Sequence, residues 1–340
     1  MDSNELNRID ALGLDRGYSS QGELLRDFMA WLDLYLYFYY AHHQWLGPAS
    51  EMKNLLGLVV TREEFEHNLT KAAQRGLPSE LSAEEREQIA LAFSAVRLRL
   101  ERTTARLPLR ELFMRFHLSE FEQNCVVMAY APEIDLKYTK LFAYLQDDMT
   151  RKAAGVALCC ELFLPEGEEL ASCISRFHGS GGFVRLFKET ELENGLLVLR
   201  REVVEFLANG TLTDGDAYRL FDGCAHGRLD PLTIQEGVAR QLDAAFIYPG
   251  ACCIRLSGPQ GGGKRFQIEH LIARQRERCV FADLTGNDWR ETARSAALAA
   301  DLTDAYLCLY HLDRKDETGQ SVPPPQSMLE ELERLELHRD

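Results

Sequence analysis

The sequence predicts a mixed fold, with an α-helical first part and a shorter α/β part that contains a parallel sheet. Apolar residues recur at helical spacing over 20–177, and Ser/Thr-x-x-Glu capping boxes begin three of these segments, at Thr61, Ser82 and Ser119. After residue 251, apolar runs of strand length alternate with segments of helical spacing. This alternation is typical of parallel strands joined by crossover helices.

The composition is that of an acidic globular protein. Its 340 residues are 46% apolar and 27% charged, which is enough for two or three domains with ordinary cores. The formal net charge is −15 and the basic residues form no dense patch, which argues against a nucleic-acid partner. The nine cysteines include no Cys-x-x-Cys motif, so we expect neither a zinc site nor a disulfide framework, and we expect a cytoplasmic location.

One aromatic-rich stretch, 28–46, is long enough to be compared with a membrane span. Asp33, His42 and His43 interrupt it, together with several Tyr and Gln polar groups. The stretch therefore fits a buried or partner-facing helix better than bilayer hydrocarbon, and we expect no membrane contact. Its aromatic side chains are interpreted as core residues, with a docking surface as the alternative.

Helices are predicted from apolar spacing and from the residues that begin and end each segment. The expected ranges are 20–46, 61–75, 82–107, 119–130, 134–148, 156–164, 166–177 and 200–207. The stretch 54–60 is interpreted as a short strand or turn.

The periodicity changes from helix to strand within residues 183–199. Two short apolar runs, 183–187 and 196–199, flank Glu193-Asn194-Gly195, and Asn-Gly is a hairpin signal. Helices followed by a β-hairpin form the layout of a winged helix. The candidate recognition helix, 156–164, carries no Arg, Lys, Asn or Gln that could read bases, so a protein-binding winged helix is favoured over a DNA-binding one.

A glycine-rich turn lies between an apolar run and a helical segment. It comprises Gly258, Pro259, Gln260, Gly261, Gly262, Gly263, Lys264 and Arg265, and it matches the P-loop pattern Gly-x-x-x-x-Gly-Lys-[Ser/Thr] except at the last position. Glycines let backbone N–H groups converge on phosphate, and Lys264 can reach terminal phosphates. Arg265 replaces the hydroxyl that holds Mg²⁺, and it can pair only with phosphate or an acid. We expect ATP or ADP to bind here with poor Mg²⁺ support.

The elements around this turn predict a parallel sheet. They are strand 252–257, helix 264–278, strand 279–284, helix 287–300 and strand 305–310. The last strand should end in an acid pair that supports Mg²⁺ and activates water. In one alignment His311 replaces the first acid, and in the other Asp313 is kept while Arg314 replaces the second. Either alignment leaves the water without its usual base, so we expect no catalytic residue and no metal ligand.

Several blocks of the sequence resemble a family of bacterial AAA-family ATPases. The similar blocks are 57–61, 116–122, 131–135, Tyr138, the Leu-Phe-Ala-Tyr-Leu-Gln-Asp-Asp segment 141–148, 203–207 and 305–310. In that family a winged-helix region precedes two P-loop domains, the first often degenerate, and some relatives accompany contractile injection systems. The resemblance implies a homo-oligomeric remodelling machine whose partners are ring neighbours or a client protein. No second ATPase domain follows, so we expect an N-terminal fragment or a shortened relative.

Four regions are therefore expected. They are a helical region (1–108), a winged helix (109–209), a linker with a helix over 234–247 (210–250), and a degenerate, incomplete P-loop domain (251–340). The expected function is nucleotide binding that serves assembly or substrate docking. The alternatives are an interaction module that binds no nucleotide, a competent small NTPase, and a winged-helix DNA binder.

Overall fold

A computed structural model describes residues 15–42, 82–146, 148–165, 167–179, 181–225, 236–248, 253–259, 261–286, 288–315, 321–333 and 335. The chain divides into two compact units, Met1–Val204 and Glu205–Asp340. The predicted elements 54–60 and 61–75 lie outside the described residues, as does Gln260. Within the described residues no helix is long and apolar enough to cross a membrane.

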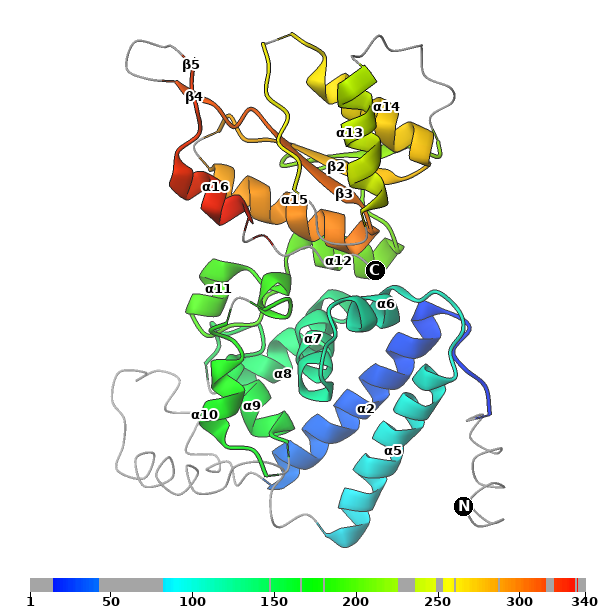
Figure 1. Ribbon diagram of the computed structural model, residues 1–340. Helices are drawn as coiled ribbons and strands as arrows, with labels where there is room; N and C mark the ends of the chain where they lie inside the picture. Colours follow the sequence, from blue (N-terminus) through cyan, green and yellow to red (C-terminus); the bar gives the residue numbers. More distant parts are fainter. Residues whose placement is uncertain are drawn as a thin grey trace. The chain divides into compact units, whose positions relative to one another are not determined.

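The described part of the first unit is built almost entirely from helices (Figure 1). In chain order they are α2 (Gln21–His42), α5 (Ala83–Glu101), α6 (Pro108–Arg115), α7 (Glu120–Ile134), α8 (Lys137–Leu145), α9 (Val156–Phe163), α10 (Leu170–Ser175), the 3₁₀ turn η1 (Val184–Leu186) and α11 (Glu189–Glu193). Helix α12 (Arg201–Asn209) spans the boundary between the units.

Two of the predicted capping boxes are confirmed. The Ser82 and Ser119 side chains each accept the backbone N–H three residues ahead, and the glutamate there binds back, so orphan donors at the starts of α5 and α7 are satisfied. Helix α5 ends at Glu101, short of the predicted residue 107. The residue before Pro108 is extended, as proline requires of its neighbour, and Pro108 then begins α6.

The aromatic residues of α2 form much of the core of the first unit. Phe28, Trp31 and Tyr39 are at most 3% exposed, and the Trp31 ring stacks on Phe163 of α9 with centroids 5.7 Å apart. This confirms the interpretation of the described part of 28–46 as core. Among the aromatic side chains of α2 whose burial is described, Tyr37 is the exception, since it is 63% exposed.

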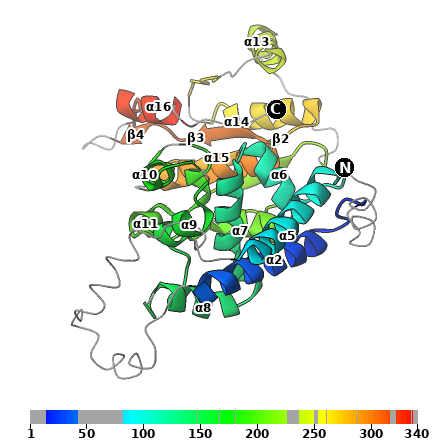
Figure 2. The same ribbon diagram turned by 90° about the horizontal axis from the view of Figure 1, so that it is seen from below.

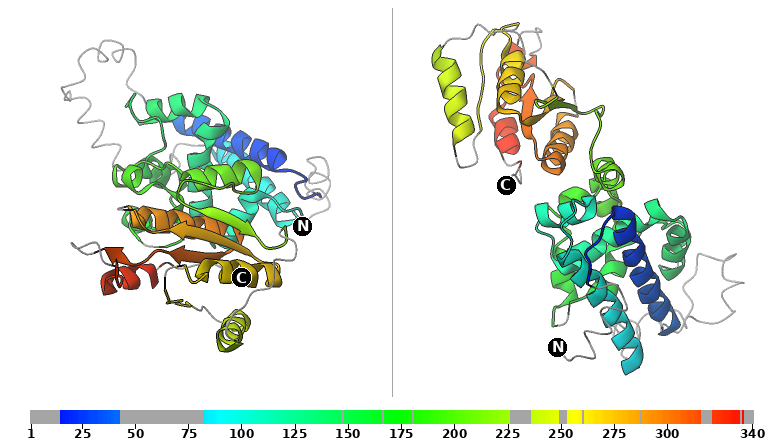
Figure 3. Two further views of the ribbon diagram at one scale, coloured as in Figure 1. Left: turned by 90° about the horizontal axis from the view of Figure 1, so that it is seen from above. Right: turned by 90° about the vertical axis from the view of Figure 1, so that its right-hand side faces the viewer.

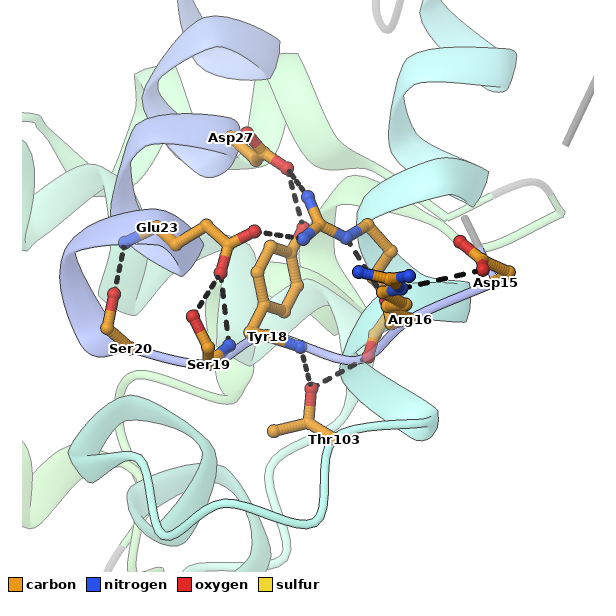
Figure 4. Close-up of polar contacts among 9 residues, drawn as sticks. Asp15, Arg16, Tyr18, Ser19, Ser20, Glu23, Asp27 and Thr103 are labelled. Atoms are coloured by element: carbon orange, nitrogen blue, oxygen red, sulfur yellow. Dashed lines mark hydrogen bonds and ion pairs between the residues drawn. The ribbon is translucent and has the colours of Figure 1, made fainter. Parts of the chain in front are cut away.

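A polar cluster, here called the Arg99 cluster, joins the start of the described chain to α2 and α5 (Figure 4). Arg99 donates to Glu23 and, at 2.7 Å, to Asp27, and its guanidinium lies 4.1 Å from the centre of the Tyr18 ring. The Tyr18 N–H donates to Thr103 Oγ1 at 2.9 Å. The arginine side chain is only 13% exposed, so these bonds replace most of its hydration.

The Arg99 cluster predicts a loss of stability in acid. Hydrogen bonds from the Ser19 backbone and from Arg99 lower the pKa of Glu23 from 4.5 to about 2. Because the folded state has the lower pKa, this contribution is complete above about pH 4.5 and is lost as the pH falls towards 2. We expect Glu23→Gln to show a smaller drop in urea midpoint across that window than the unsubstituted protein. Equal drops in the two proteins would contradict the assignment.

The predicted hairpin over 183–199 is confirmed only at its base, where Phe187 and Leu199 form one antiparallel bridge. Residues 184–186 form the 3₁₀ turn η1 where a strand was expected, and α11 lies between the two predicted strands, directly before Asn194-Gly195. Gly195 ends α11 in the left-handed conformation (φ 73°), and the N–H groups of Gly195 and Leu196 bind the Leu192 and Glu191 carbonyls. Asn194-Gly195 is therefore a helix C-terminal motif rather than a hairpin turn. The only β pairing among the described residues here consists of the isolated bridges Gly155–Leu196 and Phe187–Leu199.

The described part of the second unit contains a small mixed sheet with helices on both faces (Figures 1–3). Its elements are β1 (Arg219–Asp222), α13 (Glu236–Ile247), α14 (Lys264–Gln275), β2 (Arg278–Asp283), α15 (Trp289–Thr303), β3 (Tyr306–Tyr310), β4 (Arg314–Lys315), β5 (Ser321–Val322) and α16 (Gln326–Glu333). The strand order is β1-β2-β3, with β1–β2 antiparallel and β2–β3 parallel. Strands β4 and β5 form a separate antiparallel pair.

Alternating residues of β2 and β3 face opposite layers, as the pleat requires. Cys279 and Phe281 pack with Ile272 of α14 on one face. Leu309 packs with Ala293 of α15 on the other. Figures 2 and 3 show α14 and α15 on opposite sides of the sheet.

The predicted strand 252–257 is not observed within the described residues. Residues 253–259 form no strand, and the Ile254 side chain is 43% exposed. The strand that completes the three-stranded sheet with β2 and β3 is β1. It comes from the predicted linker 210–250 and pairs antiparallel with β2. The sheet is therefore mixed rather than parallel throughout, because four residues of the linker supply its first strand.

Candidate functional site

The candidate site is the glycine-rich turn and the sheet edge beside it. Gly261 (φ 80°) and Gly263 (φ 68°) have left-handed backbone conformations, which residues with a Cβ rarely adopt. Gly263 is also the N-cap of α14. The Gly262 N–H donates to the Pro259 carbonyl at 3.2 Å, which closes the turn. The segment predicted as a phosphate-binding turn therefore has its helix, but it lacks the expected strand before it.

Lys264 is the first residue of α14, and its ammonium group is bound by the turn itself. Its Nζ donates to the Gly258 and Pro259 carbonyl oxygens, each at 2.9 Å. Part of the turn thus presents C=O groups to a cation, while α14 still begins with the unsatisfied N–H groups common to helix N-termini. A phosphate that reached Lys264 would compete with these two carbonyls.

Arg265 is held within its own helix. Its Nε donates to Glu269 Oε1 at 2.9 Å, and its guanidinium lies over the Phe281 and Tyr310 rings, at 5.1 and 5.5 Å from their centres. Of the two partners expected for Arg265, phosphate or an acid, the structure shows an acid, which lies one turn along α14. These contacts also bring the start of α14 to the carboxyl ends of β2 and β3.

Asp283 and His311 meet at this same edge, at and just beyond the carboxyl ends of the parallel strands β2 and β3. His311 Nδ1 lies 3.0 Å from Asp283 Oδ1. Burial acts to raise the pKa of Asp283, but hydrogen bonds from His311 and the Thr285 N–H outweigh it and lower that pKa. His311 is left-handed (φ 58°), a strained conformation for a residue with a side chain. An anionic Asp283 therefore orients the imidazole through this contact.

The structure brings some of the predicted site residues together and separates others. Lys264, Arg265 and His311 gather at the carboxyl edge of β2 and β3, while Asp313 is exposed two residues further on. Sequence reasoning missed Asp283, although it ends a predicted strand at the edge where parallel α/β sheets bind ligands. Among the described residues, no group of three or more His, Cys, Asp and Glu could hold a metal ion.

The candidate recognition helix α9 is part of the core. Leu158, Cys159, Cys160, Leu162 and Phe163 are all buried. The Tyr35 hydroxyl of α2 donates to the Leu162 carbonyl, and Tyr39 Oη lies 2.8 Å from a carboxylate oxygen of Glu161. Burial raises the pKa of the Cys160 thiol to about 12, which keeps it protonated. A helix with this much buried surface cannot enter a DNA groove without leaving the core.

Comparison with known proteins identifies one similarity. A family model described as winged helix domain, variant, matches residues 10–208. Searches of curated proteins and of solved structures each found no match.

Proposed function

The chain belongs to the family described as winged helix domain, variant, whose match ends at residue 208. We propose that its first unit binds protein and, from the residues around Lys264, that its second unit carries a degenerate nucleotide site. In this proposal ATP or ADP binds at the turn before α14 without being hydrolysed by this chain. Occupancy of the site serves assembly or client docking for an ATP-driven remodelling machine of the AAA type in the cytoplasm. Hydrolysis comes from another ATPase domain of that machine.

The burial of α9 supports the protein-binding role of the first unit. A winged helix reads DNA by inserting an exposed recognition helix or wing; here the candidate recognition helix α9 is buried, and within the described residues the expected hairpin is reduced to single bridges. The helix is packed against α2, and the expected wing is replaced by η1, α11 and two isolated bridges. With a net charge of −15 on the whole chain, the electrostatic requirement for a phosphate backbone is also unmet.

The observation that carries the nucleotide site is the position of Lys264. The residue begins a twelve-residue helix after a turn with left-handed glycines, and the next residue contacts rings of both parallel strands. A helix N-terminus at the carboxyl edge of parallel strands is where α/β sheets bind phosphate groups. His311 adds a second nitrogen group at that edge, oriented by Asp283.

The same contacts argue against hydrolysis. Arg265 stands where a hydroxyl would bind Mg²⁺, and its guanidinium is committed to Glu269 and two aromatic rings. Asp283 is engaged by His311 and Thr285, so it is not a free base for water. The proposal therefore predicts binding that is independent of Mg²⁺.

Calorimetry with ATP and ADP, with Mg²⁺ and with EDTA, tests this function. We expect binding in both conditions and an affinity roughly 10- to 150-fold lower in Lys264→Ala, because a charge-assisted hydrogen bond to phosphate contributes roughly 1.5–3 kcal/mol. Arg290→Ala is the matched control: it also removes one positive charge from the second unit, from an exposed pair with Glu331, and should bind like the unsubstituted chain. Phosphate release should not exceed a protein-free blank.

A second candidate function is an interaction module that binds no nucleotide. Two observations favour it: the Lys264 ammonium is already bound by two carbonyls, and residues 253–259 lie outside the sheet. Absence of both heat and thermal shift with ATP and ADP would select this candidate. Phosphate release that disappears in Lys264→Ala would instead select a competent NTPase, and salt-dependent retention on duplex DNA would select a DNA binder.

A further inference from the structure

Helix α8 presents an apolar and basic stripe to solvent. Lys137, Lys140, Leu141 and Tyr144 are spaced i, i+3, i+4, i+7 on its outer face, while Tyr138 and Phe142 are fully buried on the inner face. Leu141 is 38% and Tyr144 49% exposed. This arrangement, here called the α8 stripe, leaves aliphatic and aromatic area uncovered beside two cations.

The surroundings of the α8 stripe extend its apolar area. Leu136 and Met149, just before and after the helix, are 76% and 75% exposed. The described residues contain eleven exposed large hydrophobic side chains, and five of them fall within 134–149. Such a concentration, unlike scattered exposed residues, marks an interaction surface.

The first half of α5 presents the complementary pattern. Glu84, Glu87, Gln88 and Leu91 are exposed with the same i, i+3, i+4, i+7 spacing, here called the α5 stripe, and Leu91 is 53% exposed. Neither Glu84 nor Glu87 has an ion-pair partner among the described residues. Both residues are exposed, which places two carboxylates at the surface of α5.

The two stripes match at three of their four positions when the helices run side by side in parallel; at the fourth position Gln88 lies opposite Leu141. Glu84 then faces Lys137, Glu87 faces Lys140, and Leu91 faces Tyr144, so opposite charges meet at two positions and apolar side chains at a third. Each stripe is exposed on its own chain, so the match requires a second molecule. Lys137 also binds Asp33 of α2 at 2.6 Å, which leaves Lys140 as the cation with no partner among the described residues.

From this match we infer that the protein self-associates, with the α5 stripe of one copy docked on the α8 stripe of another. The two surfaces differ, so the contact is heterologous. Each copy can therefore bind one neighbour through its α5 stripe and another through its α8 stripe. The stripes are only two helical turns long, so the contact is weak, and its charge pairs make it sensitive to salt. Both stripes belong to the first unit, so the inference is independent of whether the second unit binds nucleotide.

Charge-reversal substitutions at Lys140 and Glu87 in the full chain test the inference. The measurement is analytical ultracentrifugation at low salt. The unsubstituted protein should show concentration-dependent association that weakens as salt is added. Lys140→Glu alone and Glu87→Lys alone should each sediment as monomers, because each brings like charges together at the contact. An equimolar mixture of the two variants should associate again, because the lysine introduced in one variant meets the glutamate introduced in the other.

The controls separate this contact from general charge effects. Lys152→Glu changes the charge by the same amount at another exposed lysine of the first unit and should associate like the unsubstituted protein. Far-ultraviolet circular dichroism should show all variants folded. A monomeric unsubstituted protein, association of either single variant at the original strength, or failure of the mixture to associate would overturn the inference.

Discussion

Arg99→Met is expected to lower the free energy of unfolding of the first unit by about 2–3 kcal/mol. The substitution keeps the aliphatic stem but removes the guanidinium that binds Glu23 and Asp27 and covers the Tyr18 ring. Two neighbouring carboxylates, 30% and 34% exposed, would then face each other without a counter-ion. Their partial exposure keeps the effect below that of a fully buried pair. Hydrogen exchange of peptides from α2 and α5 measures the loss within this unit.

Arg106→Met is the matched control for this experiment. The Arg106 side chain is 96% exposed and lies 3.9 Å from Glu111, so its removal should change stability by less than about 0.5 kcal/mol. Adding Glu23→Gln to Arg99→Met should cost less than the sum of the two single changes, because the carboxylate no longer needs a partner. Equal protection of α2 and α5 in Arg99→Met and Arg106→Met would show that the cluster contributes little.

Gly223→Ala is expected to lower the free energy of unfolding of the second unit by about 2–3 kcal/mol. A Cβ at this position would lie 2.6 Å from the Ile272 carbonyl oxygen, 2.7 Å from the Glu277 carbonyl oxygen and 2.9 Å from the Ala273 Cα. These are backbone atoms at the end of α14 and the approach to β2, and they cannot rotate away. The Gly223 N–H also donates to Glu277 at 2.8 Å, so relief of the clash would break this bond beside β1.

Gly237→Ala provides the opposite expectation in the same unit. Gly237 lies in α13, an added Cβ would meet nothing within 4 Å beyond its chain neighbours and the backbone of its own helix, and alanine favours a helix over glycine by about 1 kcal/mol. Gly237→Ala should therefore be neutral or stabilising. Hydrogen exchange of β1 and β2 peptides in the two variants gives the comparison. Unchanged protection of β1 in Gly223→Ala would mean that this strand does not pair as described.

Local signals predicted much of the helical architecture. The capping boxes at Ser82 and Ser119 and the apolar spacing of α2 and α9 each depend on residues within a few turns, and each is confirmed. The Asn194-Gly195 signal failed because a left-handed glycine serves equally in a hairpin turn and at a helix end. Which use prevails depends on the flanking segments, and Glu189–Glu193 formed a helix.

The candidate site, too, was predicted from the sequence only in part. The pattern of glycines and Lys264 predicted a turn before a helix, and α14 begins at that lysine. Whether that turn binds nucleotide remains a prediction. The meeting of Asp283 with His311 could not be derived from spacing, because the two residues are 28 positions apart and are joined only by the parallel pairing of β2 and β3.

By itself, the sequence determined most of the longer helices of the described chain, that the aromatic side chains of α2 belong mainly to the core, and that a glycine-rich turn precedes Lys264. These properties follow from side-chain periodicity and capping, which act over a few residues. Only the tertiary structure decided that β1 rather than residues 253–257 joins β2 and that Arg265 binds Glu269. It also decided that α9 packs against α2. Strand pairing and burial are competitions among segments distant in the chain, and the segment that best covers apolar surface and satisfies backbone hydrogen bonds prevails.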